Sequence, residues 1–205
     1  MIDAALIERA SKLSSATMHE ASGRRGALPA SIRPIDRAMR LAGVALPVRC
    51  PLGDNLWIHR ALAVAEPWDV LVIEAGGGTD FGYWGEIMAT MAVARRLAGI
   101  VISGGVRDTQ QLISLGLPTF SSGVAIRGTE KDPTGAGAVG EPVRMGETVV
   151  KRGDLIVGDA DGVACFDAAT AANLIAKSEE RDLTEALIMD ELRGGASTLE
   201  IYRLE

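Results

Sequence analysis

Apolar positions along the chain follow two spacings, one typical of strands and one typical of helices. Continuous apolar runs, or apolar residues alternating with small ones, predict strands at Leu41–Arg49, Asp69–Glu74, 100–102 and 118–120. Elsewhere, apolar residues three and four positions apart predict amphipathic helices. These helices cover residues 4–13, 17–23, 54–65, 89–97 (opened by Glu86), 109–115, 168–192 and 197–202.

The order of these elements changes near Pro142. Before it, strands and helices alternate, which is typical of a central sheet with right-handed crossovers. After it, short strands at 143–150, 155–158 and 163–166 are joined by Gly and Asp turns. The sequence therefore predicts a single α/β domain over residues 1–205, with a central β-sheet layer, a β-rich second layer and flanking helices.

Two segments carry more specific expectations. Pro47 lacks a backbone N–H, so the 41–49 strand is expected at a sheet edge or with a bulge. The Gly- and Pro-containing segment 131–137 is expected to be a mobile loop.

Composition narrows the class of protein. The chain has 205 residues, 47% of them hydrophobic, and a net charge of −6, which argues against a nucleic-acid binder or an anionic-membrane binder. No apolar run approaches membrane-spanning length and no signal-peptide pattern is present, so a cytoplasmic location is expected. Cys50 and Cys165 are isolated, which disfavours a structural zinc site and predicts buried free thiols.

Several common catalytic and nucleotide-binding motifs are absent. The Gly76–Gly78 loop would need a further glycine where Phe81 stands, so it is not a dinucleotide fingerprint. The chain has no Gly-Lys-Ser/Thr sequence, no HExxH motif and no Gly-x-Ser-x-Gly elbow. These absences direct attention to carboxylate and arginine chemistry.

The strongest candidate site lies at two consecutive strand ends. Glu86 opens a predicted helix, and twenty residues separate it from Arg107 and Asp108, which follow an apolar strand and a predicted turn at 104–105. Free helix amides, carboxylates and a guanidinium in one crevice suit an anion and a hard divalent metal. Spacing alone also allows ordinary roles, with Asp108 capping the helix that contains Gln111, and Glu86 as a favourable first-turn acid.

Further polar residues have ordinary alternatives. His19, Glu20 and Arg24 form a second cluster that is also typical of a salt-bridged surface helix. His59 is typical of a packed core or interface histidine. Lys131 belongs to a polar run, with Arg127 and Thr129, that suits either anion binding or a solvated loop.

These residues give the chain a family resemblance over about residues 15–167. It resembles the class II, metal-dependent pyruvate aldolases of the 4-hydroxy-4-methyl-2-oxoglutarate / 4-carboxy-4-hydroxy-2-oxoadipate aldolase family, which shares the swivelling β/β/α fold of the regulator of ribonuclease activity A. The resemblance rests on the stretches at 16–24, 53–59, 69–73, 85–90, 105–108 and 153–157. The segment 131–140 departs from the aldolase pattern, which points to an altered substrate choice.

The resemblance implies a role for each residue of the crevice. Asp108 would be the direct ligand of Mg²⁺ or Mn²⁺, and Glu86 would bind the waters of that ion. The helix start from Gly85, through the amides of Ile87 and Met88, would bind the pyruvyl carboxylate. Arg107 would bind the keto oxygen and stabilise the enolate.

The resemblance also implies an activity and its alternatives. It predicts a lyase that cleaves a 4-hydroxy-2-oxo diacid or triacid to pyruvate and a second keto acid, with oxaloacetate decarboxylation alongside. His19, Glu20 and Arg24 would act at the far carboxylate or in proton transfer, with the chain assembled as a homotrimer or homohexamer. The alternatives are oxaloacetate decarboxylation as the main activity, or a non-enzymatic ribonuclease-binding regulator.

Overall fold

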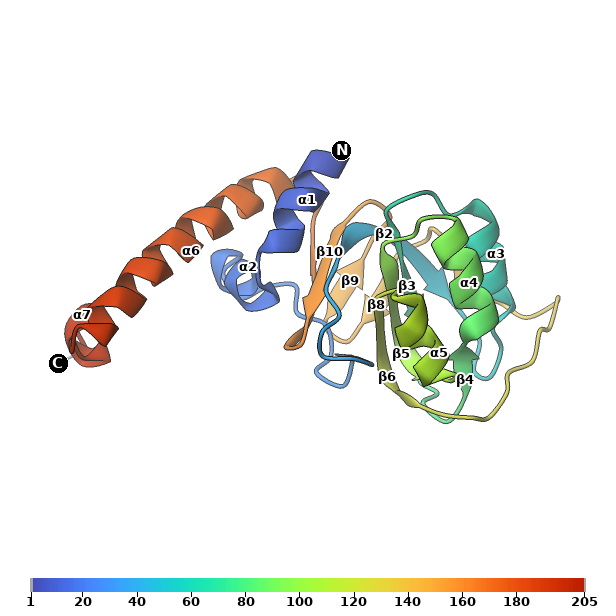
Figure 1. The fold of residues 1–205 in the computed structure, drawn as a ribbon. Coiled ribbons are helices and arrows are strands. Elements are labelled where there is room, and N and C mark those ends of the chain that lie inside the picture. Colours follow the sequence, from blue (N-terminus) through green and yellow to red (C-terminus); the bar gives the residue numbers. More distant parts are fainter. Residues whose placement is uncertain (1, 205) are drawn as a thin grey trace.

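The computed structural model describes residues 2–204 as an α/β fold with one large mixed sheet (Figure 1). Its helices are α1 (Ala4–Lys12), α2 (Ser15–Ala21), α3 (Leu56–Val64), α4 (Glu86–Ala94), α5 (Thr109–Leu115), α6 (Ala171–Arg193) and α7 (Thr198–Tyr202). Its strands are β1 (Arg33–Pro34), β2 (Leu41–Arg49), β3 (Asp69–Glu74), β4 (Gly82–Trp84), β5 (Gly99–Val106), β6 (Thr119–Val124), β7 (Ala138–Val139), β8 (Val143–Met145), β9 (Thr148–Val150), β10 (Leu155–Asp159) and β11 (Gly162–Phe166).

The sheet has the order β1-β6-β5-β3-β2-β10-β11, with β4 paired to β5 and β7 paired to β2. Neighbours among β2, β3, β5 and β6 are parallel, whereas β10 and β11 join by antiparallel pairing. The predicted α/β class is confirmed. The parallel strands are continuous apolar runs because both of their faces are covered.

The sheet curls until its two ends approach each other. β1 pairs with β6 at one end, and the segment before β1 pairs with β11 at the other through an Ala27–Ala164 bridge. The Leu28 N–H donates to the Val163 carbonyl at 2.9 Å. The result is a nearly closed barrel whose interior is filled by Val70, Val72, Val101, Phe120 and Ile156, together with Val143, Met145 and Val150 of the β8–β9 hairpin.

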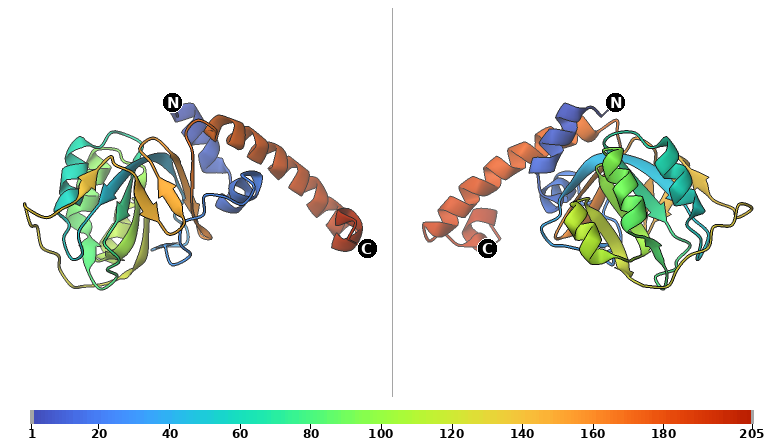
Figure 2. Two further views of the ribbon diagram at one scale, coloured as in Figure 1. Left: turned by 180° about the vertical axis from the view of Figure 1, so that it is seen from behind. Right: turned by 45° about the vertical axis from the view of Figure 1, so that its right-hand side comes forward.

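Two groups of helices cover the outside of this barrel (Figures 1 and 2). Helices α3, α4 and α5 pack against the parallel strands. Helices α1, α2 and the beginning of α6 pack on β10 and β11, and the rest of α6 leaves the body as an arm that ends in α7. None of the helices within residues 2–204 is long and apolar enough to cross a membrane.

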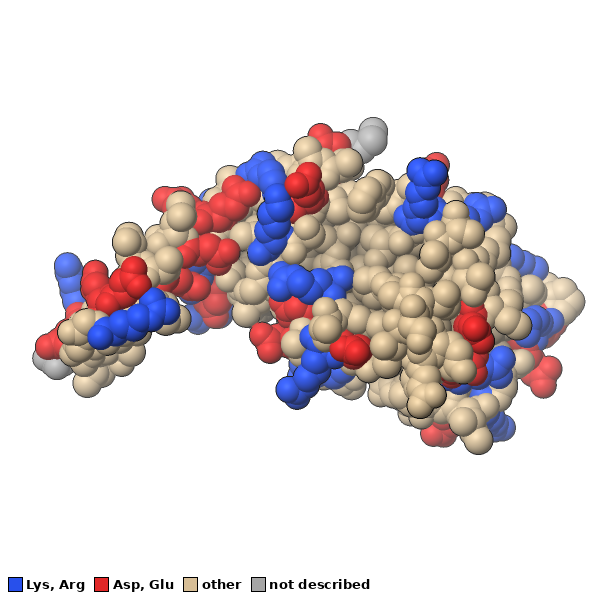
Figure 3. Space-filling view, viewed as in Figure 1, with Lys and Arg blue, Asp and Glu red and all other residues tan. Residues whose placement is uncertain are grey.

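The outer surface differs between these two groups. In Figure 3, acidic and basic side chains are interspersed along the arm, whereas the surface over α4 and α5 is mostly uncharged. The exposed apolar residues of α4 and α5 include Ile87, Met91, Val93 and Ile113. The arm carries exposed apolar residues of its own, namely Leu183, Leu187, Met189, Leu199 and Tyr202.

Pro47 is tolerated in the interior of the sheet, so the expectation of an edge strand was wrong. β2 lies between β3 and β10, but its pairing with β10 involves only 41–44 and its pairing with β7 begins at Val48. The Pro47 carbonyl faces this interval and accepts from the Gly140 N–H at 2.8 Å. The N–H that Pro47 lacks therefore falls in the interval where neither β10 nor β7 needs a donor from β2.

The predicted turn at Gly104 and Gly105 is also wrong, because β5 continues through both glycines. A Cβ atom at Gly104 would lie 2.8 Å from the Tyr83 ring, and one at Gly105 would lie 2.7 Å from the Phe81 carbonyl oxygen. These glycines permit close approach of the 79–83 segment rather than a turn.

Smaller differences concern boundaries. The single strand expected at 143–150 is the β8–β9 hairpin, α2 begins two residues earlier than expected, and the short strands β1, β4 and β7 were not predicted. Both cysteines are buried and free, as expected.

Candidate active site

A small cavity of about 110 Å³ lies where the sequence placed its strongest candidate site. Its walls come from the start of α4, the end of β5, helix α3 and the segment after β6. The lining residues are Asn55, His59, Gly85, Ile87, Met88, Arg107, Asp108 and Lys131. The structure thus brings the predicted helix start at Gly85–Met88 and the Arg107–Asp108 pair together.

Asp108 points toward the start of α4 rather than capping its own helix. It occupies the N-cap position of α5, yet its side chain makes no capping hydrogen bond there. Its Oδ2 atom instead accepts from the Glu86 N–H at 3.1 Å, and the Arg107 Nε lies 3.8 Å away. Its backbone is left-handed, with φ of 57°, a strained region that Asp tolerates better than most residues. The capping interpretation of Asp108 is therefore wrong.

The start of α4 presents backbone donors to the same cavity. The first intrahelical bond runs from the Ala89 N–H to the Gly85 carbonyl at 3.1 Å, so the N–H groups of Ile87 and Met88 precede it. Such a helix end attracts anions. Glu86 contributes its N–H, while its exposed side chain is not among the lining residues.

Two glycines make room for the Arg107–Asp108 pair. A Cβ atom at Gly85 would lie 2.4 Å from the Asp108 Oδ2 and 3.2 Å from the Arg107 Cγ. A Cβ atom at Gly82 would lie 3.1 Å from the Arg107 Cβ. The Arg107 N–H donates to the Trp84 carbonyl at 2.9 Å. This bond fixes the main chain at Arg107 against the segment that contains the two glycines.

Asn55 is a site residue to which the sequence analysis gave no role. Its side chain is buried, and its Nδ2 donates to the Tyr83 carbonyl at 2.9 Å. Its Oδ1 is buried without a hydrogen-bond partner among the described residues. An unsatisfied buried acceptor is costly, so a donor from outside the chain is expected at this wall. The 53–59 stretch was noticed only as part of the family resemblance.

His59 and Lys131 also line the cavity, although the sequence analysis did not place either of them in the candidate site. Burial lowers the pKa of the His59 imidazole below its ordinary 6.5, and the positive charge of Lys131 lowers it further. His59 is thus neutral at neutral pH, and Lys131 is the positive charge beside it.

We expect Lys131→Met to raise the pKa of His59, because it removes the nearby positive charge while the burial of the ring remains. NMR titration of the imidazole protons measures this, with the distant Lys12→Met as a control that leaves the value unchanged. Because folding lowers this pKa, His59 takes up a proton more readily in the unfolded chain than in the folded one. The free energy of unfolding therefore decreases as the pH falls below 6.5. An unchanged His59 pKa in Lys131→Met would show that the two groups are not neighbours.

Comparisons with known proteins identify the family of the chain. A family model described as RraA-like, aldolase/RraA, matches residues 2–165. The chain belongs to the RraA-like family. A relative of this RraA-like protein in Halalkalibacterium halodurans, 34% identical over 154 residues that cover 75% of this chain and 72% of the relative, bears the name "Putative 4-hydroxy-4-methyl-2-oxoglutarate aldolase".

Solved structures show the same fold. An uncharacterised protein from Pseudomonas syringae pv. tomato superposes with a TM-score of 0.86 at 26% identity, covering 99% of this chain and 94% of that one. A Streptomyces coelicolor protein described as an unusual member of the RNase ES inhibitor RraA family superposes with a TM-score of 0.80 at 24% identity. It covers 93% of this chain and 100% of its own. The predicted RraA-like fold is therefore confirmed.

The second polar cluster of this RraA-like protein lies apart from the cavity. His19 lines a different pocket, beside residues 27–30 and 161–164. Arg24 binds Glu20 on the surface, with 3.1 Å between Nε and Oε2. Within one chain, the structure does not bring His19, Glu20 and Arg24 to Arg107 and Asp108.

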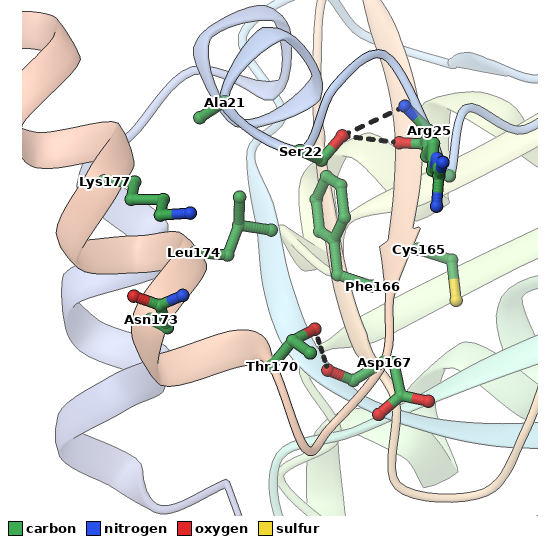
Figure 4. Close-up of a pocket in the computed structure, with 11 residues that line it drawn as sticks. Ala21, Ser22, Arg25, Cys165, Phe166, Asp167, Thr170, Asn173, Leu174 and Lys177 are labelled. Carbon is green, nitrogen blue, oxygen red and sulfur yellow. Dashed lines mark hydrogen bonds between the residues drawn. The ribbon is translucent and has the colours of Figure 1, made fainter.

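A larger cavity of about 400 Å³ lies between the turn after α2, the end of β11 and the first turns of α6 (Figure 4). Leu174 and Lys177 reach into it from α6, opposite Phe166. Cys165 contributes to the lining, but its thiol points away from the cavity into the barrel interior (Figure 4). Burial raises the pKa of this thiol far above the ordinary value, so the thiol stays protonated. None of the predicted site residues lines this cavity.

Proposed function

We propose that this RraA-like protein is a divalent-metal-dependent lyase that cleaves a 4-hydroxy-2-oxo diacid or triacid to pyruvate and a second keto acid. The observation that carries the proposal is the contact between the Asp108 carboxylate and the Glu86 N–H. The lining of one small cavity, which includes Asp108, Arg107 and the start of α4, supports it further. The name of the Halalkalibacterium relative supports an aldolase.

A divalent cation fits the residues of this cavity. Residues 2–204 contain no group of three or more His, Cys, Asp or Glu side chains arranged to hold a metal, so Asp108 would share the ion with water. Mg²⁺ keeps several waters in this way, and Mn²⁺ accepts similar ligands. The unsatisfied Oδ1 of Asn55 is a second point of fit, because waters bound to a cation donate hydrogen bonds. Glu86 is proposed to orient such waters.

The residues of the cavity account for the proposed chemistry. As the bond between C3 and C4 breaks, the C4 hydroxyl loses its proton and becomes the carbonyl of the second keto acid. The electron pair of the broken bond stays on the pyruvyl fragment, delocalised onto the C2 oxygen, until C3 takes up a proton to give pyruvate. The N–H groups of Ile87 and Met88 would hold the pyruvyl carboxylate. Arg107 would donate to the C2 oxygen and stabilise the developing negative charge. The cation, when bound, supplies further positive charge at that oxygen.

The same electron movement follows when oxaloacetate loses CO₂, so decarboxylation is proposed as a companion activity, or as the main one. A non-enzymatic, ribonuclease-binding role is the second candidate. It is favoured by the description of the Streptomyces neighbour and by the uncharged surface over α4 and α5.

We further propose that the chain acts as a trimer or hexamer in the cytoplasm. The exposed apolar residues of the arm suit contact with second copies of the chain, as do Ile87 at the cavity and Ile126 in a neighbouring hollow beside Arg107 and Asp108. His19, Glu20 and Arg24 would then act on a neighbouring subunit's site. Light scattering measures the assembly, and a monomeric mass would exclude it.

The decisive experiment measures pyruvate release from oxaloacetate and from 4-carboxy-4-hydroxy-2-oxoadipate, with Mg²⁺ and with EDTA. We expect release from both with Mg²⁺, loss with EDTA and recovery when Mn²⁺ is added. Samples without protein correct for the spontaneous decarboxylation of oxaloacetate. Release from neither substrate would contradict the lyase proposal and favour the binding role, which capture of ribonucleases on the immobilised chain would then test.

A further inference from the structure

We propose that the larger cavity, between α2, β11 and α6, is a second ligand site that binds a small organic carboxylate. Lys177 would hold the carboxylate, and Phe166 and Leu174 would pack against the apolar body of the ligand. The cavity measures about 400 Å³, and pockets that hold small molecules generally measure about 300–1,000 Å³. It shares no lining residue with the candidate active site, so the inference stands apart from the proposed lyase function.

One face of α6 supplies the polar groups for the carboxylate. Asn173, Leu174 and Lys177 line the cavity, and they lie three and four positions apart along the helix. Side chains at these intervals share one face of a helix, so Asn173 and Lys177 are placed to contact one carboxylate together. Figure 4 shows Lys177 extending from α6 toward the cavity.

Lys177 is the exception among the cations of α1, α2 and α6, the helices that cover β10 and β11. The other Lys and Arg residues of these helices each form an ion pair with a carboxylate, namely Arg9, Lys12, Arg181 and Arg193. No carboxylate among residues 2–204 forms an ion pair with Lys177. Its exposed ammonium group is therefore available to an anionic ligand.

The carboxylate on the lining, that of Asp167, does not cancel this charge. Its Oδ1 atom accepts from the Ala169 N–H at 2.8 Å, and Figure 4 shows the side chain directed away from Lys177. Arg25, in the turn after α2, is a second cation on the lining, and it also forms no ion pair with any described residue. The lining thus carries an excess of positive charge.

The apolar part of the lining determines what kind of anion fits. Phe166 and Leu174 are both largely buried, and they approach the cavity from β11 and α6 (Figure 4). Ala21 adds a methyl group at the end of α2. A carboxylate on an aromatic or branched body would cover this surface, whereas inorganic phosphate would leave it in contact with water.

The side of the cavity opposite α6 is held in place by hydrogen bonds. The Ser22 Oγ accepts from the Arg25 N–H at 3.0 Å, and the Cys165 N–H donates to the Gly26 carbonyl at 2.8 Å. Gly26 has a positive φ of 88°, and a Cβ atom there would collide with the Cys165 carbonyl oxygen. This side is therefore formed before a ligand arrives, so binding does not require the ordering of a loop.

The test titrates benzoate into the full chain and follows the benzoate protons by saturation-transfer NMR. We expect a dissociation constant on the order of 1 mM, as for a small ligand with one charged contact. Lys177→Met should raise this constant about 10-fold, the usual effect of losing one charge-assisted hydrogen bond, and Lys177→Arg should nearly retain the wild-type value. Neither benzamide nor inorganic phosphate, at the concentration of benzoate, should displace it.

Hydrogen exchange locates the bound benzoate independently of any activity. We expect benzoate to slow amide exchange in residues 22–26 and 170–178 and to leave residues 85–90 and 105–109 unchanged. Lys12→Met is the matched control on α1, because Lys12 already pairs with Glu8. Arg107→Met is the control at the candidate active site, and both controls should bind benzoate as the wild type does.

Each contrary outcome would overturn the proposal. No binding of benzoate at millimolar concentrations would exclude the site, as would an unchanged affinity in a Lys177→Met variant with the melting temperature of the wild type. Loss of binding in Arg107→Met but not in Lys177→Met would place the anion in the candidate active site. Displacement by benzamide would exclude recognition of the charge, and displacement by phosphate would exclude a role for the apolar wall.

Discussion

Replacing Asp108 by Asn is expected to lower metal-dependent pyruvate release by about 1,000-fold or more, because a neutral amide is a weak ligand for a hard cation. Asn has nearly the same shape, tolerates the left-handed backbone at this position and keeps an oxygen that can accept from the Glu86 N–H. The loss would therefore report the missing charge rather than a changed fold. Pyruvate release and Mn²⁺ binding by titration calorimetry measure the two effects together.

The matched control for this variant is Asp36→Asn. Asp36 accepts a hydrogen bond from the Ala38 N–H at 2.8 Å and does not line the cavity, so its variant should behave as the wild type. Full activity in Asp108→Asn would show that this carboxylate does not hold the metal. Loss of activity with unchanged Mn²⁺ binding would place the metal elsewhere.

Replacing Gly85 by Ala, which adds a single methyl group, is expected to lower pyruvate release about 100-fold. This is the usual effect of displacing a catalytic group by roughly 1 Å. The new Cβ atom would start 2.4 Å from the Asp108 Oδ2, so the carboxylate must move and its bond to the Glu86 N–H must lengthen. The backbone of Gly85 is extended, with φ of −156°, so Ala adds no backbone strain there. The effect would be local to the site.

Gly123→Ala is the control for this substitution. Gly123 lies in β6 of the same sheet, and a Cβ atom there would meet no atom within 4 Å. The two variants should have melting temperatures close to that of the wild type, whereas only Gly85→Ala should lose activity. Wild-type activity in Gly85→Ala would mean that the position of the Asp108 carboxylate does not limit the reaction.

The sequence predicted those elements whose pattern is local. β2, β3 and α5 have the predicted boundaries, because a continuous apolar run or a helical spacing determines each without reference to the rest of the chain. Gly104 and Gly105 were assigned to a turn because glycine marks both turns and close contacts. Only the positions of Tyr83 and Phe81 beside β5 distinguish the two.

Only one half of the candidate site could be predicted from the sequence. Gly85, Arg107 and Asp108 follow consecutive strands, so the topology rule for sheet ends brings them together. Asn55 and Lys131 join them through the attachment of a loop to α3, which depends on the buried Asp54 carboxylate. No spacing in the sequence indicates that Asp54 binds the Asp132 N–H, so this half of the site required the structure.

The left-handed backbone of Asp108 has a consequence for the order in which the site forms. Because the main chain itself aims this carboxylate, its direction is set when β5 and α5 fold, before any ligand arrives. The conformational entropy of that aspartate is thus lost during folding and not again during ion capture. The same geometry disfavours glutamate at this position, because the left-handed region is tolerated better by aspartate than by longer side chains.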